Sequence, residues 1–123
     1  MTAEPRAYVR EAADALLEAG VTLVAGHSAH VFHGVSTRVL FDLGDFLDDY
    51  AVDRRLRNDL GLLYLVDLAG DRLEAIPLKL EFAHTRLAMD DDASWIKRRF
   101  TKACAAFGTE VIAANGRLLA RWR

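Results

Sequence analysis

The sequence contains few of the residues that mark specialised structural classes. Its one cysteine, Cys104, cannot form an internal disulfide, so nothing in the sequence requires an oxidising compartment. Two prolines and eight glycines among 123 residues exclude collagen-like and proline-rich chains. The longest apolar runs, such as Leu60 to Val66, are much shorter than the ~20 residues of a membrane-spanning helix. We therefore expect no membrane segment in this chain.

An excess of charge of one sign is also lacking. Lys and Arg number 16 and Asp and Glu number 18, which gives a net charge of -2. This balance provides no electrostatic reason for the whole chain to bind nucleic acid, and we expect no nucleic-acid partner. Residues 1–20 carry charges throughout, unlike a signal peptide. The chain as given is therefore expected in the cytoplasm, and at the membrane or outside it if an upstream extension exists.

What is present is the composition of a folded domain. Hydrophobic residues make up 52% of the chain and charged residues 28%, which argues against intrinsic disorder. A chain of 123 residues has the common size of one domain and can bury one core. We expect residues 1–123 to form a single α/β domain.

The hydrophobic pattern predicts a helix followed by a buried strand at the start of the chain. Tyr8, Ala12 and Leu16 recur at helical spacing, and Gly20 is suited to end the helix. The apolar, β-branched run Val21 to Ala25 is typical of a strand buried on both faces of a parallel sheet.

The rest of the chain alternates between predicted strands and one further helix. The phase of the apolar residues in the long return strand changes near Ile76 and Pro77, which predicts a bulge or bend there and an edge position for Pro77. The expected elements are an irregular stretch at 26–34, a strand at 38–43, a polar loop at 44–58, a strand buried on both faces at 60–68, a return strand at 72–85, a helix at about 93–107, and a terminal hairpin with a type I′ turn at Asn115-Gly116.

Three histidines, His27, His30 and His33, follow directly after the first predicted strand. Ligands of open α/β sheets bind just beyond the carboxyl ends of strands, and neutral imidazole is a common metal ligand. The pattern therefore predicts either a metal site or a surface loop with local hydrogen bonds, and spacing alone does not separate the two. His84 lies at the end of a strand and is interpreted as structural.

An acidic segment follows the second predicted strand. Asp42 and Asp45 stand where they could approach the histidine loop and act as oxygen ligands or general bases. Alternatively, Asp45 caps a helical turn, and Asp48 and Asp49 form a solvated face paired with Arg54 and Arg55. The run Lys97 to Arg99 is interpreted as a solvated helix face, and Cys104 as an inert core thiol.

Two motifs together resemble a known family. Gly26-His27-Ser28-Ala29-His30 follows a helix and a buried strand, and Gly44-Asp45-Phe46 follows the next short strand. This order resembles the C-terminal part of the CapA family of poly-γ-glutamate capsule biosynthesis proteins, which are related to calcineurin-like metallophosphoesterases. The resemblance implies the C-terminal portion of a metallophosphoesterase-like αββα sandwich.

The resemblance also implies a site. It makes His27 and His30 ligands of a divalent metal ion, with Asp45, Asp42 and His33 as residues that orient the ligands or stand in the ligand loop. It assigns no catalytic residue. Family members carry earlier ligands in a long N-terminal part that this sequence does not contain, so we interpret the chain as the C-terminal portion of such a protein or a shortened gene product.

Two functional hypotheses follow. The first is a capsule biosynthesis protein with a metal-dependent hydrolase site that is incomplete in this chain. The second is a non-catalytic α/β module that works by association. Under either hypothesis, the apolar faces left uncovered favour a homo-oligomer, or a partner chain that supplies the missing N-terminal half.

Overall fold

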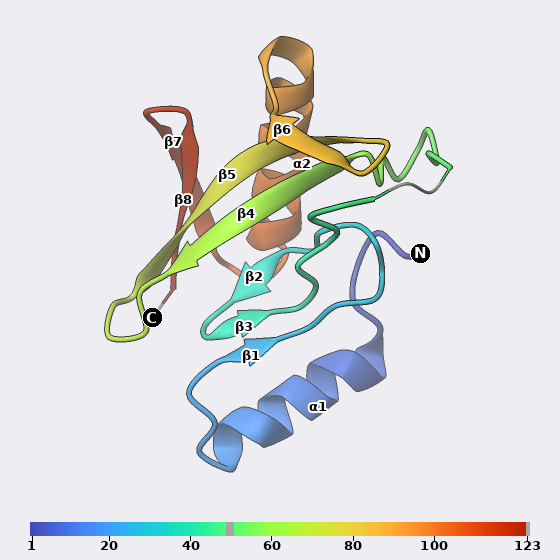
Figure 1. Ribbon diagram of the computed structural model, residues 1–123. Helices are drawn as coiled ribbons and strands as arrows, with labels where there is room; N and C mark the ends of the chain where they lie inside the picture. The colour runs from blue at the N-terminus through green and yellow to red at the C-terminus, as the bar shows by residue number, and fades with distance from the viewer. Residues whose placement is uncertain (49–50, 123) are drawn as a thin grey trace.

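The computed structural model describes residues 1–48 and 51–122 (Figure 1). Within these residues the chain forms two helices and two sheets, which confirms the predicted α/β class. The elements in chain order are α1 (Ala7–Glu18), β1 (Val24–Ala25), β2 (Val35–Ser36), β3 (Val39–Leu40), β4 (Leu60–Val66), β5 (Arg72–Glu81), β6 (His84–Leu87), α2 (Asp90–Ala105), β7 (Glu110–Ala114) and β8 (Arg117–Arg121).

The smaller sheet has the strand order β1-β3-β2, with β1 parallel and β2 antiparallel to β3. Helix α1 lies along it (Figure 1), and Ala13 of the helix packs against Val39 and Phe41. The helix ends as predicted. Gly20 adopts a φ of +100°, and the amide groups of Gly20 and Val21 donate to the carbonyls of Leu17 and Leu16.

The first predicted strand is shorter and less buried than its apolar sequence suggests. Only Val24 and Ala25 pair with β3, and Val21 is 39% exposed. Burial on both faces was wrong because β1 is the edge strand of this small sheet, so one side of it has no neighbour among the described residues. The sequence does not predict strand β2, since two residues are too few to show an alternation of apolar and polar side chains.

The larger sheet has the strand order β4-β5-β8-β7, and β6 pairs with β5 beyond the end of β8. Helix α2 packs against one face of this sheet (Figure 1). Ile96, Phe100 and Cys104 of the helix are fully buried, and burial raises the pKa of the Cys104 thiol to about 11. The predicted core stripe and the inert thiol are therefore confirmed.

Strand β4 is buried only at its start. Leu60, Gly61 and Leu62 are buried, whereas Leu63 is 38% exposed and Leu65 is also exposed. The prediction that this strand is covered on both faces was wrong because α2 covers one face only. The strand also lies at the edge of its sheet, so its outer side is unpaired among the described residues.

The predicted return strand is two strands. Phe82 and Ala83 have positive φ values and turn the chain from β5 into β6. The predicted bulge is absent from the described β4–β5 pairing, which runs without a break through Ile76 and Pro77. Instead, the alternation of buried and less buried side chains along β5 is interrupted at Pro77 and Leu78, which are both buried. Pro77 lies at the gap between the β5–β8 and β5–β6 pairings, where its missing N–H removes no ladder hydrogen bond.

The later elements follow the prediction closely. Helix α2 starts with three aspartates in its first turn, where the helix dipole favours negative charge. The β7–β8 hairpin turns at Asn115 and Gly116, both with positive φ, as a type I′ turn requires. His84, at the start of β6, is exposed.

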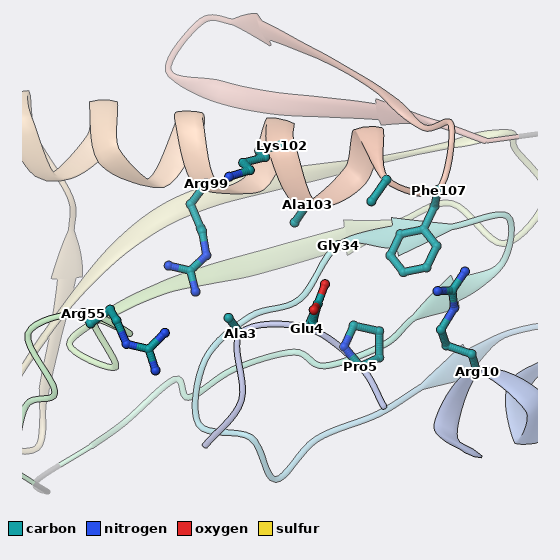
Figure 2. Close-up of a pocket in the computed structure, with 11 residues that line it drawn as sticks. Ala3, Glu4, Pro5, Arg10, Gly34, Arg55, Arg99, Lys102, Ala103 and Phe107 are labelled. Carbon is teal, nitrogen blue, oxygen red and sulfur yellow. The ribbon is translucent and has the colours of Figure 1, made fainter. Parts of the chain in front are cut away.

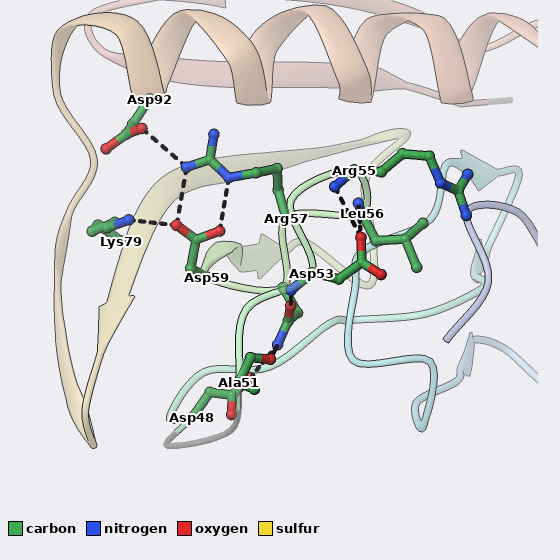
Figure 3. A network of polar contacts seen from close by, with 10 residues as sticks. Asp48, Ala51, Asp53, Arg55, Leu56, Arg57, Asp59, Lys79 and Asp92 are labelled. Atoms are coloured by element: carbon green, nitrogen blue, oxygen red, sulfur yellow. Dashed lines mark hydrogen bonds and ion pairs between the residues drawn. The ribbon is translucent and has the colours of Figure 1, made fainter.

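A buried ion network ties the loop at 51–59 to both β5 and α2 (Figure 3). Arg57 donates two hydrogen bonds of 2.9 Å to Asp59 and lies 3.4 Å from Asp92. Lys79 of β5 also pairs with Asp59, whose side chain is 7% exposed. Although burial opposes it, hydrogen bonds from Arg57 and Lys79 lower the pKa of Asp59 to about 2.

This network predicts acid-sensitive stability. A carboxyl with an unfolded pKa of 3.8 and a folded pKa of about 2 stabilises the fold above pH 4, and this contribution is lost as pH falls through 2. Asp59→Asn should therefore lower the free energy of unfolding by about 2 kcal/mol at pH 7. Urea denaturation measured across this pH range tests both statements. Glu81→Gln breaks an exposed ion pair with Arg86 and should change little; an equal loss in both variants would contradict the role of Asp59.

Candidate functional site

The histidine loop is anchored to the end of the smaller sheet. The Gly26 amide donates to the Leu40 carbonyl at 2.8 Å, and the Leu43 amide donates back to Gly26 at 2.9 Å. A bridge between Phe32 and Leu43 closes the far end of the loop. The loop therefore lies at the end of β1, next to the acidic segment, as predicted.

Asp42 joins the histidine loop to the acidic segment. Its two carboxylate oxygens accept hydrogen bonds of 2.9 Å from the amides of Ala29 and Gly44. The side chain is buried, and both oxygens are used by backbone donors of two different loops. Asp42 thus ties together the backbone of the two loops that carry His30 and Asp45.

The turn that carries Asp45 depends on two glycines. Gly44 has a φ of +70°, which an L side chain rarely adopts. Gly61 of β4 lies so close that a Cβ atom there would be 2.7 Å from the Asp45 carbonyl oxygen. The Asp45 turn therefore packs directly against the larger sheet, and the site lies where the two sheets meet.

The structure brings together His30, Asp45 and Asp48. His30 Nδ1 lies 2.9 Å and 3.1 Å from the two carboxylate oxygens of Asp45. One donor atom from each of the three residues lies within 4.8 Å of the others. The imidazole comes from the histidine loop, and the two carboxylates come from the acidic segment. His30 and Asp45 are 15 residues apart along the chain.

Two carboxylates held this close perturb each other. The pKa of Asp45 is raised by burial and then by its contact with Asp48, while His30 acts in the opposite direction. A cation at this place would relieve the repulsion between the carboxylates. The perturbation is the kind found at functional sites, where like charges are forced together.

Asn58 positions Asp48 and was not recognised from the sequence. Its side-chain amide lies 3.4 Å from an Asp48 oxygen and donates to the Ala51 carbonyl at 3.1 Å, while its oxygen accepts from the Asp53 amide (Figure 3). Asp48 is only 8% exposed, so its reading as part of a solvated face was wrong. Asp49 lies outside the described residues. An asparagine in a polar loop gives no periodic signal, so nothing in the sequence singled out Asn58.

The other two histidines of the loop lie elsewhere. His27 is exposed and lines a separate cavity of about 410 Å³ together with His33 and Asp42. His33 is buried, and its Nε2 donates to the Thr2 carbonyl at 2.8 Å, which ties the segment before α1 to the loop. His27 is therefore not part of the His30 cluster, and the expected convergence of His27 and His30 is not seen.

The loop backbone departs from ordinary conformations at the cluster. Ser28 has a φ of +101° and His30 one of +65°. Such values cost about 1–3 kcal/mol for residues other than glycine and tend to gather at functional sites. Here they turn the His30 imidazole toward Asp45.

The three donors fit a divalent metal ion. Donor atoms that share one ion at about 2.1 Å are about 3–4 Å apart, which the limit of 4.8 Å accommodates. Mixed imidazole and carboxylate donors suit Zn²⁺ and Mn²⁺. Three protein ligands also leave coordination positions for water or substrate, as in catalytic metal sites.

Comparisons with known proteins support the CapA-like resemblance. Residues 1–50 match the family described as bacterial capsule synthesis protein PGA_cap. The chain is 29% identical over 118 residues to the probable polyglutamine synthesis accessory proteins of two Mycobacterium tuberculosis strains. The match covers 85% of this chain and 30% of each relative, so the chain spans less than a third of their length. It is thus similar in sequence to a capsule synthesis family and to proteins named as polyglutamine synthesis accessory proteins. No helix within the described residues is long and apolar enough to cross a membrane.

The cluster predicts opposite pKa responses to two substitutions. Asp48→Asn removes a carboxylate that raises the pKa of Asp45, so that pKa should fall. His30→Ala removes a partner that lowers it, so the pKa should rise. Carboxyl ¹³C NMR titration measures both shifts without added metal. Asp14→Asn, an exposed change on α1, should leave the Asp45 titration unmoved; shifts of the same sign in both cluster variants would show that the cluster is misassigned.

Proposed function

We propose that this chain is a CapA-like capsule or poly-γ-glutamate biosynthesis protein that supplies part of a metal-dependent hydrolase site. The observation that carries the proposal is the cluster of His30, Asp45 and Asp48, in which His30 and Asp45 come from the two motifs of the resemblance. The match of residues 1–50 to the capsule synthesis family supports the same assignment, because it spans all three residues.

Each residue of this chain has a defined task in the proposal. His30 and Asp45 would hold the metal, Asp48 would complete the donor set, and Asp42 and Asn58 keep the two ligand segments in place. A bound divalent ion would supply an activated water for hydrolysis. His27 stays a predicted ligand of a fuller site, since it is on the same loop but faces the neighbouring cavity.

The proposal predicts metal binding by the isolated chain. Isothermal titration with Mn²⁺ or Zn²⁺ should show one site, and Asp45→Asn or His30→Ala should weaken it at least tenfold, because each removes a direct ligand. His27→Ala should leave the affinity unchanged if the cluster alone holds the ion, and weaken it if His27 is also a ligand.

His84→Ala is the matched control, since His84 is an exposed histidine on β6, outside the cluster. It should bind metal like the parent chain, and circular dichroism should show that all variants are folded. Equal affinity in the parent chain, Asp45→Asn and His30→Ala would refute the metal site.

A second candidate function is a non-catalytic association module. It is favoured by an apolar groove of about 430 Å³ between the smaller sheet and β4, whose lining includes Leu23, Leu43, Phe46, Leu63 and Val66. Strand β4 lines this groove, and one of its sides has no strand partner among residues 1–48 and 51–122; an open strand edge favours pairing with another chain. The occupant we propose is a second copy of the chain, or a protein segment that corresponds to the part of the relatives that this sequence does not span.

Both candidates meet at Asp45, which also lines the apolar groove. A partner seated in the groove would lie beside the metal cluster and could provide further ligands. Association would then complete the site, in agreement with the first proposal. An associating chain that binds no metal would favour the module alone.

Association should depend on β4. Leu63→Lys places a charge in the groove and should weaken self-association at least tenfold, because burying a leucine contributes about 1.5–3 kcal/mol. Light scattering at micromolar concentrations measures the mass. Ile112→Lys on β7 alters an equally exposed apolar side chain at the opposite edge of the same sheet and should have no effect. A monomeric parent chain would contradict the proposed self-association.

A further inference from the structure

A second cleft, which we call the basic cleft, is lined by positively charged side chains. It has a volume of about 440 Å³ and lies between the segment before α1, the loop at 51–59 and α2 (Figure 2). Four cationic residues line it: Arg10, Arg55, Arg99 and Lys102. The basic cleft shares no lining residue with the metal cluster, so its chemistry is separate from the function proposed above.

The walls of the basic cleft are held in place by contacts within the chain. A Cβ atom at Gly34 would lie 2.4 Å from the carbonyl oxygen of Ala103, so the loop at Gly34 is pressed against α2. The segment before α1 is fixed by the hydrogen bond from His33 Nε2 to the Thr2 carbonyl. A ligand would therefore enter a formed cleft and would lose little free energy in ordering it.

Arg55 and Arg99 bring two positive charges close together inside the cleft. In Figure 2, Arg99 reaches down from α2 toward Arg55, which points inward from the loop at 51–59. Burial, and then the charge of Arg55, lowers the pKa of Arg99, because each makes a charged guanidinium less favourable there. Arg99 also lies over the ring of Trp95 at 5.2 Å, which limits the orientations of its planar group.

This pair of guanidinium groups has no carboxylate partner in residues 1–48 and 51–122, where neither group forms an ion pair. The charge of Asp53 attracts Arg55, but Asp53 Oδ1 accepts hydrogen bonds of 2.9 Å and 2.8 Å from the amides of Arg55 and Leu56. Of the described residues that line the cleft, only Glu4 is acidic. The four cations therefore leave an excess of positive charge that a bound anion would balance.

We propose that the basic cleft binds an organic phosphate, with a phosphate group between Arg55 and Arg99. A phosphate group carries nearly two negative charges at pH 7 and three acceptor oxygens, so one group can pair with both guanidinium forks. A single carboxylate can neutralise only one of them. Pro5, Ala103 and Ala106 give the cleft an apolar wall, against which the organic part of the ligand can pack.

The remaining cations extend the site to a second phosphate group. Lys102 and Arg10 also line the cleft, and Arg10 is held over the ring of Phe107 at 4.9 Å. A nucleoside diphosphate, with about three negative charges and a flat ring, matches both the excess charge and the apolar wall. The C-terminal half of α2 borders the cleft, and its dipole disfavours an anion. The affinity must therefore come from the side chains.

Fluorescence titration with methylanthraniloyl-labelled ADP tests the proposal at about 50 mM salt, with a chelator present so that no metal ion bridges the ligand to the cluster. Arg55→Ala should weaken binding about tenfold, because it removes charge-assisted hydrogen bonds. Arg99→Lys keeps the charge but loses the planar fork, and should weaken binding about threefold.

Arg54→Ala and Arg98→Ala are the matched controls. Each removes an exposed arginine from the same loop or the same helix, and neither residue lines the cleft. Both variants should change the affinity by less than about twofold. Losses in the controls equal to those in Arg55→Ala and Arg99→Lys would show non-specific attraction and overturn the proposal.

Competition by unlabelled ligands identifies the chemistry. ADP should compete more strongly than AMP, which has one phosphate group, and adenosine should not compete. Citrate, with three carboxylates, should compete more weakly than ADP; stronger competition would overturn the assignment to phosphate. Pyrophosphate as strong as ADP would overturn the role of the apolar wall, and absence of ADP binding would overturn the site. Asp45→Asn should bind ADP normally, and a loss in that variant would contradict the separation of the two sites.

Discussion

The candidate site depends on the buried carboxylate of Asp42. By accepting one hydrogen bond from the histidine loop and one from the Gly44 turn, it holds together two segments that carry His30 and Asp45. Charge-assisted hydrogen bonds to backbone amides are among the stronger interactions of a protein interior. This bridge opposes relaxation of the strained backbone at Ser28 and His30, together with the hydrogen bonds of Gly26 and the bridge between Phe32 and Leu43. The geometry of the cluster thus depends on a residue that is not one of its three donors.

A second constraint comes from the unequal covering of the two sheets. Helix α2 protects one face of the larger sheet and α1 packs on the smaller sheet, but the groove between the smaller sheet and β4 stays open. Gly61 lets the Asp45 turn press against β4, so the open groove and the metal cluster share a wall. This sharing explains how a partner chain could affect chemistry at the cluster without replacing any of its ligands.

The sequence was informative wherever local physical chemistry decides the structure. Gly20 at the end of α1, the Ile96–Phe100–Cys104 stripe and the Asn115-Gly116 turn each follow from a single period or from a conformational requirement. The sequence was misleading where an apolar run was interpreted as a strand buried on both faces. Leu63 and Val21 belong to apolar runs, but Leu63 lies on an edge strand and Val21 precedes the two-residue edge strand β1, and position in a sheet is not encoded in a short window. Asp48 and Asn58 were missed as a pair because their contact joins two positions of an irregular loop.

The separation of the histidines has a structural reason of the same kind. His27 and His30 are three residues apart, and in a regular helix they would share a face. Here the positive φ values at Ser28 and His30 turn the chain between them, so His30 faces Asp45 while His27 faces the cavity beside His33. One loop therefore presents imidazoles to two neighbouring spaces, with Asp42 lining one and positioning the ligands of the other. The three-residue spacing that suggested a shared ligand pair therefore places the two histidines in different environments, because backbone conformation and not spacing sets where each imidazole points.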